Sequence, residues 1–271
     1  MTHLSLDAFT GTLALVGAGK MGGAMLDGWL ARGLDPGRVA VFDPQPPPGL
    51  ARHVGLRLNP RDGVAADVMV LAVKPQVAAE ALPPLKPLVG PASLVVSIMA
   101  GRTLRFLEAA LPQAAVVRAM PNTPAAIGRG ITVAVANARV TEAQRGLATR
   151  LLAAAGAVEW IDDEALMDAV TAVSGSGPAY VFLLAESLAR AGEAAGLPPA
   201  LAERLARETI AGSGELLHRS REPAATLRQN VTSPGGTTAA ALGVLMAKDG
   251  LDPLMEKAVA AATRRSRELG S

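Results

Sequence analysis

Cysteine is absent from this sequence of 271 residues, and histidine and aromatic residues are rare. Without cysteine, the chain has no disulfide framework, no thiolate metal site and no cysteine nucleophile. The three histidines, His3, His53 and His218, lack the spacing of metal ligands, so we expect no metal centre. Aromatic residues make up 3% of the chain and apolar residues 50%, which predicts a core of alanine, leucine and valine.

Long runs of one charge and long apolar runs are also missing. The formal net charge is +2, and no run of lysine and arginine is long enough to predict a nucleic-acid partner. The apolar runs have the length of strands, so no membrane span is predicted. Residues 1–11 lack the pattern of a signal peptide. We therefore expect a cytoplasmic protein.

Short apolar segments alternate with helical stretches through the first half of the chain. This alternation is typical of a parallel sheet with helices on both faces, a doubly wound α/β fold. The predicted strands are residues 13–16, 39–42, 68–73, 94–98, 116–119, 131–135 and 158–161. The predicted helices between them are residues 21–32, 76–82, 104–111 and 142–155.

The sequence pattern changes near residue 163, after which no strand is predicted. One helix is predicted to start at Ser176 as its N-cap, and another to end near Arg221. A third is predicted after the loop 231–236, capped by Thr237 or Thr238. The sequence thus predicts a sheet domain at residues 1–162 and an all-helical domain at residues 163–271. Part of the apolar helical surface is expected to be buried against a second chain.

A glycine-rich turn follows the first predicted strand at once and opens a helix. Gly17 allows a tight turn, Gly19 allows close approach of a pyrophosphate, and Gly22 allows close packing of helix on strand. The helix N-terminus adds free N–H groups and a positive dipole for the phosphates. The cofactor contacts predicted in this turn are Gly17, Ala18, Gly19, Lys20, Met21 and Gly22. The alternative is a tight turn that binds nothing.

An acidic residue, Asp43, follows the second predicted strand. A carboxylate in this position accepts hydrogen bonds from the ribose hydroxyls of NADH and repels the 2′-phosphate of NADPH. No arginine follows it directly, and the next one along the chain is Arg52. Asp43 therefore favours NADH, unless it only starts a turn before the proline that follows.

The ends of the later strands are expected at the same edge of the sheet, where ligands bind in such folds. Lys74 and Pro75 follow the third strand, and Lys74 is either a contact to the ribose or phosphates or a solvated lysine. Ala100 follows the fourth strand, and the proline-rich segment 120–124 follows the fifth. These small strand ends would let a nicotinamide ring lie flat against the backbone.

Two segments of the helical half, residues 174–178 and 230–238, are rich in serine, threonine and glycine. Their N–H groups and hydroxyls at helix starts suit a carboxylate ligand, and Ser174, Ser233 and Gly236 are the predicted contacts. Two ordinary capped helix starts would have a partly similar composition, so that alternative stays open.

From about residue 15 to residue 245 the chain resembles the pyrroline-5-carboxylate reductases. The matching segments are residues 16–22, 72–76, 97–101, 120–124, 168–180 and 230–238, of which the last two are long and specific. The resemblance implies a Rossmann domain followed by an all-α dimerisation domain, with helices interleaved in a homodimer or a ring of dimers. It also implies reduction of L-1-pyrroline-5-carboxylate to L-proline by NADPH or NADH, the last step of proline biosynthesis.

The resemblance also assigns roles to single residues. It implies cofactor contacts at residues 17–22, Ala72, Lys74 and Asn230, and substrate contacts at Glu164, Thr237 and Thr238. The Thr238 hydroxyl would bond the ring nitrogen during catalysis. Thr237 stands where alanine is common, which matters little if its N–H makes the contact. Asp43 departs from the Ser, Thr, Asn or Arg common in the family, which often prefers NADPH.

Two other functions would share the glycine-rich turn. A hydroxy-acid dehydrogenase of related fold would keep a catalytic lysine near residues 174–180, where this chain has none. A dinucleotide sensor without turnover would have no reason to keep the polar loop 230–238. Reduction of a cyclic imine needs neither a nucleophile nor a metal, because positioning two bound reactants suffices.

Overall fold

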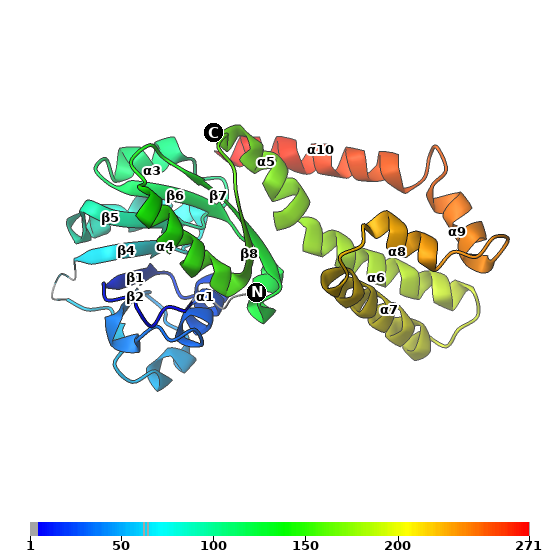
Figure 1. The fold of residues 1–271 in the computed structure, drawn as a ribbon, viewed down its shortest axis with the longest axis horizontal. Coiled ribbons are helices and arrows are strands. Elements are labelled where there is room, and N and C mark those ends of the chain that lie inside the picture. The colour runs from blue at the N-terminus through cyan, green and yellow to red at the C-terminus, as the bar shows by residue number, and fades with distance from the viewer. Residues whose placement is uncertain (1–4, 62, 64, 271) are drawn as a thin grey trace. The chain divides into compact units, whose positions relative to one another are not determined.

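The structure, a computed structural model, describes residues 5–61, 63 and 65–270 (Figure 1). Its internal contacts divide the chain into two compact units. The first runs up to Gly175 and also includes the residues from Thr263 onward; the second is Ser176–Ala262. Residues 163–175 therefore belong to the same unit as the sheet, although the sequence places the domain boundary near residue 163. The division into two domains at that residue remains a prediction.

An eight-stranded sheet forms the centre of the first unit, in the order β3-β2-β1-β4-β5-β6-β7-β8. The strands are β1 (Leu13–Val16), β2 (Val39–Phe42), β3 (Arg57–Leu58), β4 (Ala66–Leu71), β5 (Val89–Ser97), β6 (Ala115–Met120), β7 (Gly130–Ala136) and β8 (Gly156–Trp160). The strand order turns back between β1 and β4, because β1 leads to β2 on one side while β4 pairs on the other. Such a switch point is where ligands bind in doubly wound sheets.

Helices cover both faces of this sheet, as the alternation of the sequence predicts. The helices of the first unit are α1 (Lys20–Leu30), α2 (Ala78–Ala81), α3 (Leu104–Ala110), α4 (Glu142–Leu152) and α5 (Met167–Val170). On one face, α1 and α4 pack on side chains such as Leu15 and Val41. On the other, α2 and α3 pack on side chains such as Val16 and Met69. Alternate residues of each central strand therefore enter different cores, which explains the continuous apolar runs.

Two strands, β7 and β8, run opposite to the other six and depart from the parallel sheet that the sequence predicts. β7 pairs antiparallel with β6, and β8 then pairs parallel with β7. Between β6 and β7 lie only residues 121–129, which include a 3-10 helix at Thr123–Ile127. A parallel connection needs a crossover of roughly a dozen or more residues, so this short segment returns the chain in the opposite direction.

The second unit is entirely helical among its described residues. Its helices are α6 (Gly177–Ala194), α7 (Pro199–Arg219), α8 (Ala224–Asn230), α9 (Thr237–Leu245) and most of α10 (Leu251–Gly270), whose last turns belong to the first unit. The sequence does not predict α8. No helix in the described part of the chain has the length and hydropathy of a membrane span.

The predicted side-chain caps of two of these helices are wrong. Ser176 precedes α6 with a helical backbone, and its side chain makes no capping hydrogen bond. Thr237 and Thr238 are the first two residues of α9, and Gly236 holds the N-cap position. In both places the hydroxyls lie at a helix start without capping it.

Candidate functional site

The glycine-rich turn joins β1 to α1 at the switch point of the sheet. Gly17 has a φ of 91°, a left-handed conformation that favours glycine. Its N–H donates to the Phe42 carbonyl at 2.8 Å. A Cβ on Gly17 would lie 2.9 Å from the carbonyl carbon and oxygen of Ala72. The turn therefore requires glycine, and it brings the ends of β1, β2 and β4 together.

The other two glycines of the motif have different surroundings. A Cβ on Gly22 would lie 2.1 Å from the Gly17 carbonyl oxygen and 3.1 Å from the Ala72 Cβ. By contrast, a Cβ on Gly19 would meet nothing within 4 Å. Packing therefore demands glycine at 17 and 22, whereas the exposed face of Gly19 leaves space for a ligand. Gly19 is also the N-cap of α1, so no side chain caps the N–H groups at the start of this helix. This open position fits a dinucleotide pyrophosphate.

Asp43, the first residue after β2, faces the glycine-rich turn. Its Oδ2 accepts a hydrogen bond from the Ala18 N–H at 2.7 Å, and its Oδ1 accepts one from the Gln45 N–H at 2.8 Å. Each carboxylate oxygen can accept more than one hydrogen bond, so both can also receive ribose hydroxyls. Arg52, the next arginine after Asp43 along the chain, lies instead beside Asp27 of α1, with Nη2 3.6 Å from Asp27 Oδ1.

The segment after β4 borders the same switch point. The Ala72 N–H donates to the Val16 carbonyl at 2.8 Å, which holds Ala72 beside β1. Lys74 is exposed, and Pro75 starts a short 3-10 helix. Arg102, which follows β5, was not predicted as part of the site. Its Nε and Nη2 donate to the Pro75 carbonyl at 3.1 and 2.7 Å. Its guanidinium also lies 4.7 Å from the centre of the Phe106 ring.

Ala100 is exposed at the end of β5, as the predicted nicotinamide contact requires. It follows the buried Met99 and precedes Gly101, whose φ of 73° turns the chain. Asn122, in the segment after β6, accepts a hydrogen bond from the Ile131 N–H at 3.0 Å and thereby fixes that segment to β7.

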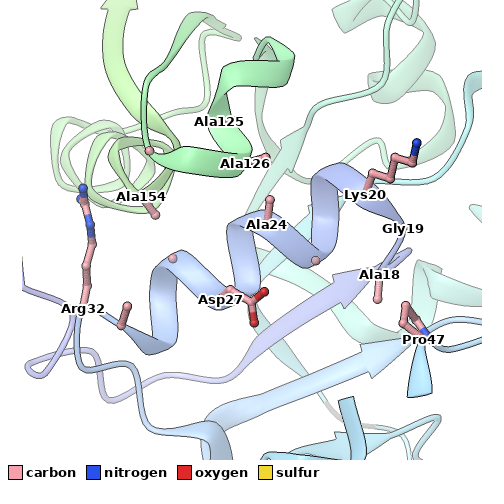
Figure 2. Close-up of a pocket in the computed structure, with 14 residues that line it drawn as sticks. Ala18, Gly19, Lys20, Ala24, Asp27, Arg32, Pro47, Ala125, Ala126 and Ala154 are labelled. Carbon is pink, nitrogen blue, oxygen red and sulfur yellow. The ribbon is translucent and has the colours of Figure 1, made fainter. Parts of the chain in front are cut away.

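A pocket of about 700 Å³ runs along α1 from the glycine-rich turn (Figure 2). Ala18, Gly19 and Lys20 line one end, and Figure 2 shows Lys20 at the start of α1 and Arg32 at its far end. The opposite wall includes Ala125 and Ala126 of the 3-10 helix after β6, which the sequence reasoning did not single out. Their only sequence signal is their small size after the proline-rich segment 120–124.

Glu164, a predicted substrate contact, lies in the first unit just after β8. Its Oε1 accepts hydrogen bonds from Arg118 Nη1 at 2.7 Å and from the Leu104 N–H at 2.8 Å. The Arg118 side chain is 7% exposed and that of Glu164 is 28% exposed, so the ion pair is largely buried. Both residues line a pocket of about 320 Å³ together with Asp168, which accepts a hydrogen bond from Ser266 at 2.7 Å.

Ser174 lies in a single π-helical turn, Thr171–Gly175, before α6. Its Oγ is buried and has no hydrogen-bond partner among the described residues. Buried hydroxyls are rarely left without a partner, and π-helical turns are frequent at functional sites. Both observations agree with the prediction that Ser174 contacts a ligand, which stays a prediction.

The polar loop between α8 and α9 belongs to the second unit. The Gly236 N–H donates to the Ser233 carbonyl at 3.0 Å, which closes a turn in front of Thr237 and Thr238. Asn230, the last residue of α8, donates from Nδ2 to Glu222 Oε2 at 3.3 Å. The fold thus gathers Ser233, Gly236, Thr237 and Thr238 in one loop. Glu164, Ser174 and the predicted cofactor contacts other than Asn230 lie in the first unit.

Fold and site together define an oxidoreductase with a Rossmann dinucleotide-binding domain that is followed by a helical domain in the same chain. Residues 164–269 match the family model described as "Pyrroline-5-carboxylate reductase dimerisation". Residues 12–101 match the model described as "NADP oxidoreductase coenzyme F420-dependent".

Full-length relatives give the family. The chain is 42% identical to a pyrroline-5-carboxylate reductase of Pseudomonas aeruginosa over 266 residues, covering 96% of this chain and 97% of the relative. It is also 42% identical to one of Synechocystis, covering 95% of this chain and 98% of the relative. The chain belongs to the pyrroline-5-carboxylate reductase family.

Solved structures agree with this assignment. A pyrroline-5-carboxylate reductase from Coxiella burnetii aligns with a TM-score of 0.88 at 36% identity, covering 97% of this chain and 99% of that one. A pyrroline carboxylate reductase from Plasmodium falciparum with NADP bound aligns with a TM-score of 0.81 at 31% identity, covering 97% and 99%. The predicted family and fold class are confirmed.

Proposed function

We infer that the chain reduces L-1-pyrroline-5-carboxylate to L-proline with NADH or NADPH, in the last step of proline biosynthesis. Membership of the family over nearly the full length carries this inference. The glycine-rich turn supports it, because the glycines at 17 and 22 are demanded by packing while the face of Gly19 is open.

The cofactor would lie along the edge of the sheet where β1, β2 and β4 end. The turn 17–22 would hold the pyrophosphate with N–H groups at the start of α1. Asp43 would accept hydrogen bonds from the ribose, while Ala72, Lys74, Pro75 and Ala100 would line the path toward the nicotinamide. When bound, the reduced nicotinamide supplies the hydride for the C=N bond.

The substrate carboxylate would be held in the second unit by the loop after α8. Ser233 would offer its hydroxyl, and Gly236 and Thr237 would offer their N–H groups. Asn230, the last residue of α8, would contact the cofactor. Thr238, the second residue of α9, would accept a hydrogen bond from the protonated ring nitrogen through its hydroxyl oxygen. Such positioning suffices for hydride transfer between two bound reactants.

Glu164 and Ser174 remain proposed substrate contacts, and the structure supports them unequally. The unpartnered hydroxyl of Ser174 supports a ligand contact. The Glu164 carboxylate already accepts hydrogen bonds from Arg118 and the Leu104 N–H, which supports a structural role as well.

The proposal also covers the choice between NADH and NADPH. Asp43 faces the glycine-rich turn, and Arg52, the cation that could offset its charge toward a 2′-phosphate, lies beside Asp27. We therefore propose that NADH is used at least as well as NADPH.

The proposed assembly is a homodimer formed through the helical unit, with rings of dimers as a further possibility. The family model matched there is one for dimerisation. Side chains of α6 support it, because Val181, Phe182, Leu183 and Leu184 are 46–63% exposed in the single chain. Light scattering would give the molar mass of the assembly. A cytoplasmic location stays an expectation from the sequence.

One assay tests the activity against its alternatives. Purified chain is mixed with reduced cofactor and pyrroline-5-carboxylate, and cofactor oxidation is followed while L-proline is identified by chromatography. Pyrroline-2-carboxylate, which keeps the ring and carboxylate but moves the C=N bond, is the matched control substrate. Turnover with a 2-hydroxy acid and oxidised cofactor instead would support the hydroxy-acid dehydrogenase. Cofactor binding with no turnover on any substrate would support the sensor.

A further inference from the structure

Asn59, the first residue after β3, has a left-handed backbone. Its φ is 46°, and it is the only non-glycine residue with a positive φ in the described part of the chain. Asparagine tolerates this conformation better than most residues, but the conformation still has an energetic cost. Such a backbone persists where surrounding contacts hold it in place, and Asn59 makes these contacts to the strand end that bears Asp43.

The side-chain amide of Asn59 bonds both main-chain groups of Asp43. The Asp43 N–H donates to Asn59 Oδ1 at 2.9 Å, and Asn59 Nδ2 donates to the Asp43 carbonyl at 2.8 Å. The main-chain N–H of Asn59 donates to the Val41 carbonyl at 2.8 Å. Asn59 thus continues the pairing of β3 with β2 by one residue and fixes the backbone just past the end of β2.

The Asp43 carboxylate is fixed on the other side of the same residue. It accepts hydrogen bonds from the Ala18 N–H of the glycine-rich turn and from the Gln45 N–H. With its backbone held by Asn59, Asp43 has little freedom to turn its carboxylate away from the turn. The negative charge of Asp43 is therefore held in one position beside the glycine-rich turn.

We propose that Asn59 is a positioning residue that makes the enzyme select NADH over NADPH by holding Asp43 against the glycine-rich turn. This proposal rests on the proposed use of a nicotinamide cofactor at that turn. A fixed carboxylate is preorganised to accept the ribose hydroxyls of NADH. It also cannot move away from the 2′-phosphate of NADPH, so the repulsion between like charges is retained.

The test replaces Asn59 with glycine. Glycine adopts the left-handed backbone without steric cost, so Asn59→Gly removes the amide while keeping the backbone preference. Dissociation constants for NADH and NADPH are measured by fluorescence titration without substrate. We expect the preference for NADH to fall about tenfold, the effect of losing one to two hydrogen bonds. A merely structural role would weaken the binding of both cofactors equally.

Two further variants isolate the effect. Asn137 also bonds backbone groups of the sheet, the Val116 N–H and the Ala114 carbonyl, but at the opposite end of the strands. Asn137→Ala should lower the melting temperature and leave the ratio of the two dissociation constants unchanged. In an Asp43→Ser background, Asn59→Gly should have no effect on that ratio, because the carboxylate is absent.

The outcomes separate this proposal from the proposed function. Wild-type protein that binds neither cofactor would overturn both. Wild-type protein that binds NADH, with an unchanged ratio in Asn59→Gly, would overturn only the positioning role. A wild type that strongly favours NADPH would also overturn it. If Asn59→Gly does not fold, Asn59→Ser serves the same test, since its short hydroxyl cannot reach both groups of Asp43.

Discussion

The guanidinium of Arg102 donates two hydrogen bonds to the carbonyl oxygen of Pro75, from Nε at 3.1 Å and from Nη2 at 2.7 Å. These bonds tie the turn after β5 to the segment after β4, and both segments contain proposed cofactor contacts. Phe106 supports the guanidinium from the first turn of α3. One side chain therefore links the segments that follow two neighbouring strands.

Replacing Arg102 with methionine should loosen the segment at Pro75. Hydrogen bonds that involve a charged group contribute about 1.5–3 kcal/mol, part of which would appear as weaker cofactor binding. We expect the KM for the cofactor to rise several-fold, roughly 3- to 10-fold, with a smaller change in kcat. Arg105, an exposed arginine of α3 three residues further along the chain, provides the matched control Arg105→Met. Equal KM values in the two variants would contradict the role of Arg102.

The glycines at 19 and 22 should respond to substitution in opposite ways. Gly19→Val adds a side chain in open space, so the stability should change by less than about 0.5 kcal/mol, while the affinity for both cofactors falls steeply. Gly22→Ala forces a Cβ to 2.1 Å from the Gly17 carbonyl oxygen, so the melting temperature should fall. Thermal unfolding and cofactor titration of both variants check this. Unchanged cofactor affinity in Gly19→Val would show that the cofactor does not bind at the glycine-rich turn.

Thr238→Ala should lower turnover far more than cofactor affinity. The helix N-cap there is Gly236 without a side-chain hydrogen bond, so the Thr238 hydroxyl is not needed to start α9. Losing a hydrogen bond to a charged group suggests an effect of about 1.5–3 kcal/mol on kcat/KM. Thr237→Ala is the control, because only the N–H of that residue is proposed to act. Wild-type kinetics in Thr238→Ala would mean that the hydroxyl does not reach the substrate.

Asp43→Ser should shift the cofactor preference toward NADPH. Like charges a few ångströms apart in a partly screened site cost about 1–4 kcal/mol, which corresponds to roughly tenfold or more in the ratio of specificity constants. The serine removes this repulsion and keeps a hydroxyl for the ribose. Specificity constants for NADH and NADPH on wild type and variant decide the matter. A wild type that already favours NADPH strongly would show that Asp43 does not face the ribose.

Arg118→Met tests whether the ion pair between Arg118 and Glu164 stabilises the folded protein. Removing one partner of a buried ion pair typically lowers the free energy of unfolding by about 3–5 kcal/mol. Because the Glu164 side chain is 28% exposed, we expect a smaller decrease here. Adding Glu164→Gln to Arg118→Met should restore part of the melting temperature, because the unpaired charge disappears. If Glu164→Gln alone keeps the melting temperature but raises the KM for pyrroline-5-carboxylate, Glu164 is a substrate contact.

The sequence alone determined those features that depend on neighbours along the chain. The apolar runs predicted the central strands because both faces of a covered parallel sheet exclude water. The spacing of Gly17, Gly19 and Gly22 predicted the strand–turn–helix, because the backbone geometry of such a turn is local. The segments 168–180 and 230–238 were specific enough to indicate the family, which the comparisons confirm.

Only the tertiary structure decided which distant residues meet. Arg118 and Glu164 lie on different elements, as do Asn59 and Asp43, and nothing in their sequence spacing indicates that either pair is in contact. The direction of β7 also depended on how a short connection closes against β6, which apolar patterns do not encode. Hydrogen bonds and ion pairs join whatever groups the folded backbone brings within about 3 Å, so these partners follow from the fold rather than from the local sequence.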